Sequence, residues 1–295
     1  MTSGNATHDD EAVADTGGAL SGADHARAIG TVEMRVVELR RPARHLLRIV
    51  AESLVPLEDP NWLRPNVAVR IHLATVGDGE ISRVYTVRSL DLGAWRMEID
   101  VVLHPGTSPM MMWVAALRAG EVFRLTGPRP HFLPPVVPGR RIAMFLDETA
   151  IPALYAILRQ WPSGSEAVGW VESADPFPVE ELREAADSAG VTLHHVRRDP
   201  ESLPGTTGAL VAAARTLTDP AGHTVWAAGE RDEMRALRTH FRSEVGLPKD
   251  DVAVFGYWKH GMSTSEVDRH RLAHYERTLA AGGRIDDLDD FAIGV

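Results

Sequence analysis

Residues 128–138 read Pro-Arg-Pro-His-Phe-Leu-Pro-Pro-Val-Val-Pro, and they separate two parts of the chain with different hydrophobic patterns. Before this stretch, apolar residues alternate with polar ones, which is the period of two that β-strands show. After it, short apolar runs alternate with segments in which apolar residues recur at helical spacing. Proline-rich segments interrupt regular structure, so we predict a domain boundary here.

The part before the boundary predicts strands and turns. Residues 66–74 place Val67, Val69 and Ile71 on one face of an extended chain. Further strands are predicted at 31–40, 44–52, 81–88 and 95–103, with turns at Arg41-Pro42 and Gly77-Asp78-Gly79. Six or so strands without a long helix between them predict a closed antiparallel barrel over about 30–130.

The part after the boundary predicts alternating strands and helices. Strands are expected at 141–146, 166–171, 191–196, 224–228 and 252–257, and helices at 149–161, 179–189 and 231–245. Thr149 is the expected N-cap of the first helix, with Pro152 in its first turn. Strand–helix–strand units predict a parallel sheet covered by helices.

Composition excludes several classes of function. The 295 residues include 31 Lys+Arg and 41 Asp+Glu, a net charge of -10, which argues against a nucleic-acid partner. The absence of cysteine excludes disulfides, cysteine metal ligands and cysteine nucleophiles. No apolar run reaches the roughly 18–20 residues of a membrane helix, and the N-terminus lacks the features of a secretory signal. We therefore expect a cytoplasmic protein without a membrane span.

Histidine positions do not predict a metal site. The chain has 13 histidines, but no His-Glu-x-x-His motif occurs. His194 and His195 are adjacent, so on a strand their side chains point to opposite faces. We expect no metal site, and nothing in the sequence defines an oligomeric state.

Several segments together resemble one protein family. They are Arg83-Val84-Tyr85-Thr86-Val87-Arg88, Val101-Val102-Leu103-His104, Trp113, Gly127-Pro128, Asp147-Glu148-Thr149-Ala150-Ile151-Pro152-Ala153, Val171-Glu172, Ala174-Asp175, Ala228-Gly229-Glu230, Gly256-Tyr257-Trp258-Lys259 and Gly261. On these segments the chain, from about Thr31 to Gly261, resembles the siderophore-interacting protein family. Its members are FAD-dependent ferric-siderophore reductases of the ferredoxin reductase-like superfamily.

The resemblance implies an activity and a division of the chain. NADPH or NADH would reduce FAD, and reduced FAD would pass electrons to the iron of a ferric siderophore. Ferrous iron binds hard oxygen chelators less tightly, so reduction would release it. The low content of bulky apolar residues predicts a disordered tail at 1–28. With the resemblance, the rest of the chain divides into an FAD-binding-type barrel at 29–135, an NAD(P)H-binding-type α/β domain at 136–262, and a C-terminal helix and tail at 263–295.

The resemblance also implies roles for particular residues. Carried over by position, the cofactor-binding residues are Arg83, Tyr85, Thr86, His104, Ser108, Trp113, Asp147, Glu148, Thr149, Gly229 and Glu230. Asp147, Glu148 and Thr149 follow a strand and open a helix, where amide groups can receive a phosphate. Lys259, Arg88 and Trp258 are the expected contacts of the ferric chelate, although Lys259 is equally consistent with a solvated surface lysine.

Other residues bear on the choice of electron donor and on the reaction. Arg197-Arg198 follow the third strand of the α/β part, where a ribose 2′-phosphate would lie, and they favour NADPH. No catalytic acid, base or nucleophile is assigned. The four-residue pattern Arg83–Thr86 taken alone is also consistent with an ordinary barrel strand.

Departures from the family pattern leave a second interpretation open. Met110 and Met111 stand where family members have small residues before Trp113, Leu146 and Pro130 stand where glycine is usual, and Asn66 replaces an aspartate. Bulk in that loop would obstruct the FAD diphosphate unless the methionine side chains fill the barrel core. The alternative function is a repurposed, FAD-free scaffold in specialised metabolism, for example a cyclase. It would bind an apolar small molecule against Met110–Met112 and Trp113.

Overall fold

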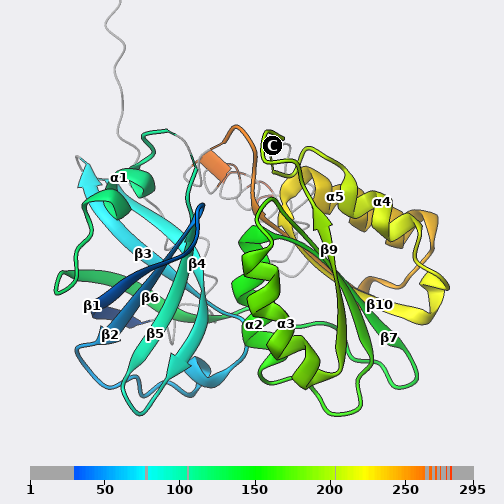
Figure 1. Cartoon of the computed structure of the whole chain (residues 1–295), viewed down its shortest axis with the longest axis horizontal. Helices are drawn as coiled ribbons and strands as arrows, with labels where there is room; N and C mark the ends of the chain where they lie inside the picture. Colours follow the sequence, from blue (N-terminus) through cyan, green and yellow to red (C-terminus); the bar gives the residue numbers. More distant parts are fainter. Residues whose placement is uncertain are drawn as a thin grey trace, which may run out of the picture.

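The computed structural model describes residues 30–76, 79–104, 106–202 and 204–262, and six single helical positions between 266 and 280. A closed barrel lies beside an open α/β domain (Figure 1). The expected tail at 1–28, the centre of the expected turn at Gly77-Asp78 and most of the expected C-terminal segment lie outside the described residues.

The first half of the chain forms a six-stranded antiparallel barrel. Its strands are β1 (Gly30–Ala43), β2 (Leu46–Ser53), β3 (Val67–Val76), β4 (Gly79–Asp91), β5 (Arg96–Val102) and β6 (Val122–Pro130). They close in the order β1-β2-β5-β4-β3-β6. Val69, Ile71, Ile99 and Leu125 are fully buried inside the barrel, as the alternation predicts. The expected barrel is confirmed.

The first predicted turn is wrong by a few residues. Strand β1 continues through Arg41 and Pro42, and the chain reverses at Arg44-His45. The register between β1 and β2 shifts between Arg40 and Ala43, so Pro42 lies in a bulge. A bulge tolerates proline because the ladder hydrogen bond is already interrupted there.

A short helix at one end of the barrel was not predicted. Helix α1 (Pro109–Ala116) begins after Ser108, whose side chain accepts a hydrogen bond from the Met111 amide at 3.3 Å. Pro109 occupies the first turn, where its missing N–H costs little. Met110 and Val114, four residues apart, are buried in the barrel core. A further short helix, the 3-10 turn Pro60–Leu63, buries Trp62 against the same core.

The second half forms a five-stranded parallel sheet in the order β11-β10-β7-β8-β9. Its strands are β7 (Arg141–Asp147), β8 (Ala167–Ser173), β9 (Val191–Arg197), β10 (His223–Glu230) and β11 (Val252–Trp258). Helices α2 (Ile151–Leu158) and α3 (Phe177–Ala189) pack on one face, and α4 (Ala209–Arg215) and α5 (Arg231–Thr239) pack on the other. The predicted parallel α/β architecture is confirmed.

Details of the helices differ from prediction. Thr149 is not an N-cap: it lies in a 3-10 turn (Glu148–Ala150) that Asp147 caps, and α2 starts at Ile151. Pro152 is in the first turn, as expected. The last predicted helix ends earlier as an α-helix and continues as a π-helical turn (His240–Glu244), while α4 was not predicted. Further 3-10 turns are at Pro220–Gly222 and Lys249–Asp251.

The strand order positions the site. The chain leaves β7 toward β8 on one side, whereas β10 lies on the other side of β7. Ligands of open α/β sheets bind at the carboxyl ends of the strands where the order reverses in this way. Helix α2, which follows the turn after β7, also packs against β4 of the barrel. The switch point therefore lies in the half of the α/β domain that contacts the barrel.

Candidate functional site

The Asp147 carboxylate joins the ends of three strands at the switch point. It accepts hydrogen bonds from the Thr149 amide at 2.9 Å and the Thr149 hydroxyl at 2.5 Å in its own turn. It also accepts from the Glu230 amide at the end of β10 and from Trp258 Nε1 at the end of β11, both at 2.8 Å. Four donors on one buried carboxylate fix the relative positions of these strand ends.

Gly229 is required by this carboxylate. A Cβ atom at Gly229 would lie 2.7 Å from Asp147 Cγ and Oδ2. Carbon atoms do not approach so closely, so a side chain at Gly229 would push the Asp147 carboxylate out of its place. Gly229, one of the cofactor-binding residues that the resemblance implies, thus has a defined structural role, because it leaves room for Asp147.

Glu230 closes the second turn in the same way. Its side chain caps α5 by accepting from the amides of Asp232 at 2.6 Å and Glu233 at 3.2 Å, and it accepts from the His260 amide at 3.1 Å. The expectation that the turn after β7 offers amide groups to a phosphate does not hold for the Thr149 amide, and the Glu230, Asp232 and Glu233 amides of the second turn are engaged in the same way. Carboxylates of the chain itself accept from these donors, so they are not available to an anion.

Arg198 is engaged in the same cluster. It is 6% exposed, donates to Glu148 Oε1 at 2.8 Å, and lies 3.7 Å from Glu172 Oε1. The predicted cation for a 2′-phosphate is thus neutralising two carboxylates instead. Arg197 at the end of β9 is exposed.

The cluster carries several buried carboxyl groups with displaced pKa values. Burial raises the pKa of Asp147, although hydrogen bonds from Thr149, Trp258 and the Glu230 amide oppose it. Burial likewise raises the pKa values of Glu148 and Glu172, each partly offset by Arg198. Burial, with the charge of Glu172 next, raises the pKa of Glu233 to about 7. This edge of the sheet is acidic and largely shielded from water.

The predicted cofactor strand of the barrel meets the α/β domain at Tyr257. Thr86 on β4 pairs with Ala68 in the ladder, and the Tyr257 hydroxyl interacts with the side chains of Thr86 and Asn66. Burial raises the pKa of Tyr257, and these hydrogen bonds oppose the shift. Tyr257 precedes Trp258, whose indole binds Asp147. The structure therefore brings Thr86 and Asp147 to one junction.

The other residues of this strand lie close by. The Tyr85 ring packs against the barrel core, and burial raises its pKa. The half-buried Arg83 side chain donates to the Ser82 carbonyl at 2.7 Å. Arg83 and Tyr85 thus extend the junction along β4.

Met110, Met111 and Met112 lie on helix α1 and differ in how deeply they are buried. Met110 is 3% exposed and lies in the barrel core, Met111 packs partly against that core, and Met112 is 56% exposed. Trp113 contacts Phe123 edge-to-face with ring centroids 5.5 Å apart. Because Met110 fills the core, the apolar lining on which the alternative function depends lacks one of its members. His104, at the other side of this segment, is exposed.

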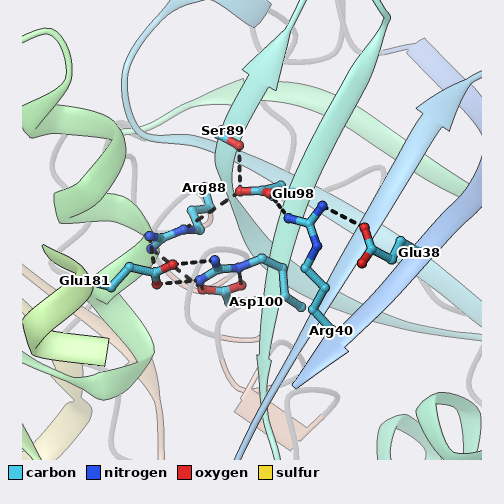
Figure 2. A network of polar contacts seen from close by, with 8 residues as sticks. Glu38, Arg40, Arg88, Ser89, Glu98, Asp100 and Glu181 are labelled. Carbon is cyan, nitrogen blue, oxygen red and sulfur yellow. Dashed lines mark hydrogen bonds and ion pairs between the residues drawn. The ribbon is translucent and has the colours of Figure 1, made fainter. Parts of the chain in front are cut away.

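The three expected contacts of the ferric chelate lie in different environments. Trp258 is half-buried at the switch point, and Lys259 pairs with Asp232 on α5. Arg88 is 2% exposed and lies within a network of ion pairs (Figure 2). The expectation that Arg88 faces a chelate does not match this position, because its guanidinium is enclosed by Asp100, Glu181 and Tyr155.

Some residues of the site carried no signal in the sequence. Glu233 follows the Gly-Glu pair by three residues but belongs to no motif, and Asn66 was noted only as a departure. Glu181 and Arg48, which enclose Arg88, lie on elements with ordinary patterns. Their proximity depends on how the two domains dock.

Two further observations concern histidines and helices. His194 stacks on Trp170, and His195 hydrogen-bonds Ser173. In the described part of the chain, no group of three His, Asp or Glu side chains is arranged to hold a metal ion. Among the same residues, no helix has the length and apolarity needed to cross a membrane.

Comparison with known proteins gives matches over both halves of the chain. A family model described as "Siderophore-interacting protein" matches residues 139–261, and one described as "Siderophore-interacting FAD-binding domain" matches residues 57–132. The chain is 36% identical over 275 residues to the ferric acinetobactin reductase of Acinetobacter baumannii, covering 93% of this chain and 94% of the relative. It is 26% identical over 249 residues to the ferric vibriobactin reductase ViuB of Vibrio cholerae, covering 78% and 89%.

Solved structures give the same result. The siderophore-interacting protein from Acinetobacter baumannii matches with a TM-score of 0.81 and 36% identity, covering 85% of this chain and 99% of that chain. A ferredoxin reductase of a carbazole 1,9a-dioxygenase matches with a TM-score of 0.58 at 19% identity, which concerns the fold alone. The fold is therefore of the ferredoxin reductase-like type.

Proposed function

We propose, since the chain belongs to the siderophore-interacting protein family, that it is an FAD-dependent reductase that takes electrons from NADH or NADPH and reduces ferric siderophores. In this proposal the barrel (29–135) holds FAD and the α/β domain (136–262) receives the donor. The relatives named above are ferric-siderophore reductases, which supports a reductase function for this chain.

The junction at Tyr257 is the observation that carries the proposal. Thr86 and Tyr257 interact across the two domains, and Trp258 is held by Asp147 at the switch point. The strand that resembles an FAD-binding segment therefore meets the sheet edge where α/β domains bind their ligands. An electron donor and an electron acceptor bound to the two domains would meet at this junction.

The described residues fit an FAD on the barrel. Arg83 supplies a cation for a diphosphate, Tyr85 an aromatic ring and Thr86 a hydroxyl group along one strand. Helix α1 begins after its N-cap Ser108, and the Met110 side chain is buried in the barrel core, so its bulk does not face the start of the helix. When bound, FAD accepts a hydride and can pass on single electrons, which iron reduction requires.

The buried carboxylates at the carboxyl edge of the sheet favour binding of the nicotinamide of NADH or NADPH and disfavour binding of its diphosphate. A nicotinamide ring becomes cationic as it loses a hydride, so buried carboxylates such as Asp147 and Glu230 stabilise that change. The same charges repel a diphosphate, whose expected amide donors are occupied. We place the diphosphate away from the two turns, with the exposed Arg197 as the cation for a 2′-phosphate.

The ferric siderophore is treated as the substrate. Reduction of Fe(III) to Fe(II) weakens its binding to hard oxygen ligands, which frees the metal. Trp258 and Lys259 are the proposed chelate contacts at the junction, and Arg88 is no longer among them because it is buried.

The test combines a flavin titration with an iron assay. The purified protein is titrated with FAD and then supplied with NADH or NADPH, a ferric siderophore and a chromogenic Fe(II) trap. Arg83→Ala is expected to weaken FAD binding by about 1.5–3 kcal/mol, the usual contribution of a hydrogen bond to a charged group. Arg44→Ala, at an exposed turn of the barrel, is the control and should bind FAD normally.

Three results would oppose the proposal or one of its assignments. A wild-type protein that binds no FAD would remove the reductase and favour the apolar-ligand alternative. A protein that binds FAD but forms no Fe(II) with either donor would remove the proposed reaction. Equal FAD affinity in Arg83→Ala and wild type would show that the cofactor strand was assigned wrongly.

A further inference from the structure

Two arginines of the barrel are buried where it meets the α/β domain. Arg48 on β2 is 5% exposed and Arg88 on β4 is 2% exposed. Figure 2 shows Arg88, Asp100 and Glu181 converging between the barrel strands and a helix of the α/β domain. Buried guanidinium groups are costly unless they are paired, so their partners decide the stability of this boundary.

Arg48 uses its whole guanidinium group in this network. Nε and one terminal nitrogen donate to the two oxygens of Asp100 on β5, at 2.7 and 2.9 Å. The terminal nitrogens also donate to the two oxygens of Glu181 on α3, at 2.6 and 2.8 Å. One bidentate pair lies within the barrel and the other crosses the domain boundary.

Arg88 is held mainly by the α/β domain. One terminal nitrogen lies 2.9 Å from Glu181 Oε2, whereas the other is 3.7 Å from Asp100 Oδ2. Its guanidinium carbon lies 3.6 Å from the centre of the Tyr155 ring on α2. The Arg88 guanidinium is therefore contacted by Glu181 and Tyr155, which lie on two helices of the neighbouring domain.

The charges of the barrel alone do not balance at this place. Two buried guanidinium groups face one buried carboxylate, Asp100. Glu98 is 4.0 Å from Arg88 and already binds Ser89 at 2.9 Å and Arg40 at 3.1 Å. Burial raises the pKa of Glu181, but the effect of Arg48 and Arg88 is opposite and larger in sum, so the pKa lies below its usual value. Glu181 is ionised and balances the second guanidinium.

We propose that Glu181 is a positioning residue, which fixes the orientation of the α/β domain on the barrel by pairing with Arg48 and Arg88 at once. The placement of these residues connects the pairing to the site. Strand β4 carries both Thr86 and Arg88, and α2 carries Tyr155 directly after the turn of Asp147. Fixing Arg88 between Glu181 and Tyr155 therefore fixes the cofactor strand relative to the switch point.

The consequence for electron transfer rests on the proposed function, but the positioning itself does not. Reacting groups on two domains must be held in a narrow range of distances, and a displacement of about 1 Å can lower a rate about a hundredfold. Loss of the Glu181 charge should therefore slow reduction of the flavin by its donor. The affinity of the barrel for FAD should remain unchanged, since Glu181 lies on α3.

The first experiment measures the distance between the domains without any ligand. The chain has no cysteine, so Ala119→Cys and Ala212→Cys, both exposed, allow spin labels on the barrel and on α4. Distance distributions are recorded by double electron–electron resonance in this background and with Glu181→Gln or Glu184→Gln added. Glu184 is exposed on the same helix and is the matched control.

The expected result is one narrow distribution for the background and for Glu184→Gln, and a shifted or broadened one for Glu181→Gln. Glu181→Asp, which keeps the charge on a shorter side chain, should lie between them. If Glu181→Gln gives the same distribution as Glu184→Gln, the positioning role is wrong. If Glu181→Gln does not fold, the Glu181→Asp variant provides the test instead. A distance distribution of Glu181→Asp equal to that of the background would then overturn the positioning role.

The second experiment measures kinetics on the FAD-loaded protein. Stopped-flow reduction by NADH or NADPH is expected to be about tenfold or more slower in Glu181→Gln, with FAD affinity equal to wild type and Glu184→Gln unchanged. A loss of FAD affinity equal to the loss of rate would show general destabilisation and overturn the proposal. If the wild type itself is not reduced, the proposed function fails, and the distance measurement still tests Glu181.

Discussion

At the scale of single residues, Glu233 has a carboxyl group whose burial beside Glu172 raises its pKa to about 7. The folded protein therefore binds this proton more tightly than the unfolded chain does. Its contribution to stability is favourable at low pH and is lost as the pH rises from about 4.5 to about 7. Above pH 7 the ionised group is a buried charge with one unpartnered oxygen.

Glu233→Gln should therefore stabilise the protein at pH 8 but hardly at pH 4.5. The free energy of unfolding is expected to rise by up to about 3 kcal/mol at pH 8, since each pKa unit corresponds to about 1.4 kcal/mol. Urea denaturation at the two pH values measures the difference. Glu184→Gln serves as the exposed control, and an equal effect of Glu233→Gln at both pH values would contradict the raised pKa.

Asp147 differs from Glu233 because donors surround it. An amide at this position keeps one acceptor oxygen but places an N–H₂ group against the Glu230 amide and the Trp258 indole. Asp147→Asn is expected to destabilise the fold by about 1–3 kcal/mol, the cost of leaving buried donors unpaired. Trp258 should also lose its fixed position. Denaturation curves and tryptophan fluorescence check both effects, and a variant as stable as wild type would indicate a protonated Asp147.

Single residues also show where sequence interpretation ends. The family resemblance identified Asp147, Glu230 and Trp258, and the structure brings all three together. It did not reveal that the amides there are occupied, because the acceptors are side chains of the same motifs. The burial of Arg88 depends on Glu181 and Tyr155 in the other domain, so the sequence around Arg88 alone does not predict it.

At the scale of elements, α1 decides how the methionine segment should be understood. Met110 is buried in the barrel core, whereas Met112 is exposed. Met110→Ala should therefore lower the free energy of unfolding by about 2–4 kcal/mol through a core cavity, with little effect from Met112→Ala. FAD binding should not improve in either variant. Urea denaturation and a flavin titration test this, and improved FAD binding by Met110→Ala would show that its side chain obstructs the cofactor.

The elements were predictable where one pattern governs many residues. Strict alternation marked the strands of the barrel, and buried runs marked those of the sheet. The two short helices α1 and α4 were missed because nearly all of their residues are apolar, so no apolar-to-polar period marks them as helices. In α1 the available signal was the Ser108-Pro109 cap. In α4 it was the spacing of the apolar residues Leu210 and Ala214, which are four positions apart and are both buried.

At the scale of the whole molecule, the boundary between the domains resembles a core more than a hinge. Arg48 and Arg88 are enclosed by partners from both sides, and Tyr257 joins β11 to the barrel through Thr86. Separating the domains would remove Glu181 and Tyr155 from Arg88 and Glu181 from Arg48, so these contacts are lost together. Such a boundary should make the two domains unfold together, although chains of this size commonly unfold domain by domain.

Calorimetry can show this coupling. Wild type is expected to give one transition in which the calorimetric and van't Hoff enthalpies agree. In Glu181→Gln the cross-domain pairs of Arg48 and Arg88 are weakened, so the heat absorption should broaden or separate into two transitions. Glu184→Gln should behave as wild type. A single transition in Glu181→Gln with matching enthalpies would mean that other contacts, such as Tyr257 with Thr86, suffice to couple the domains.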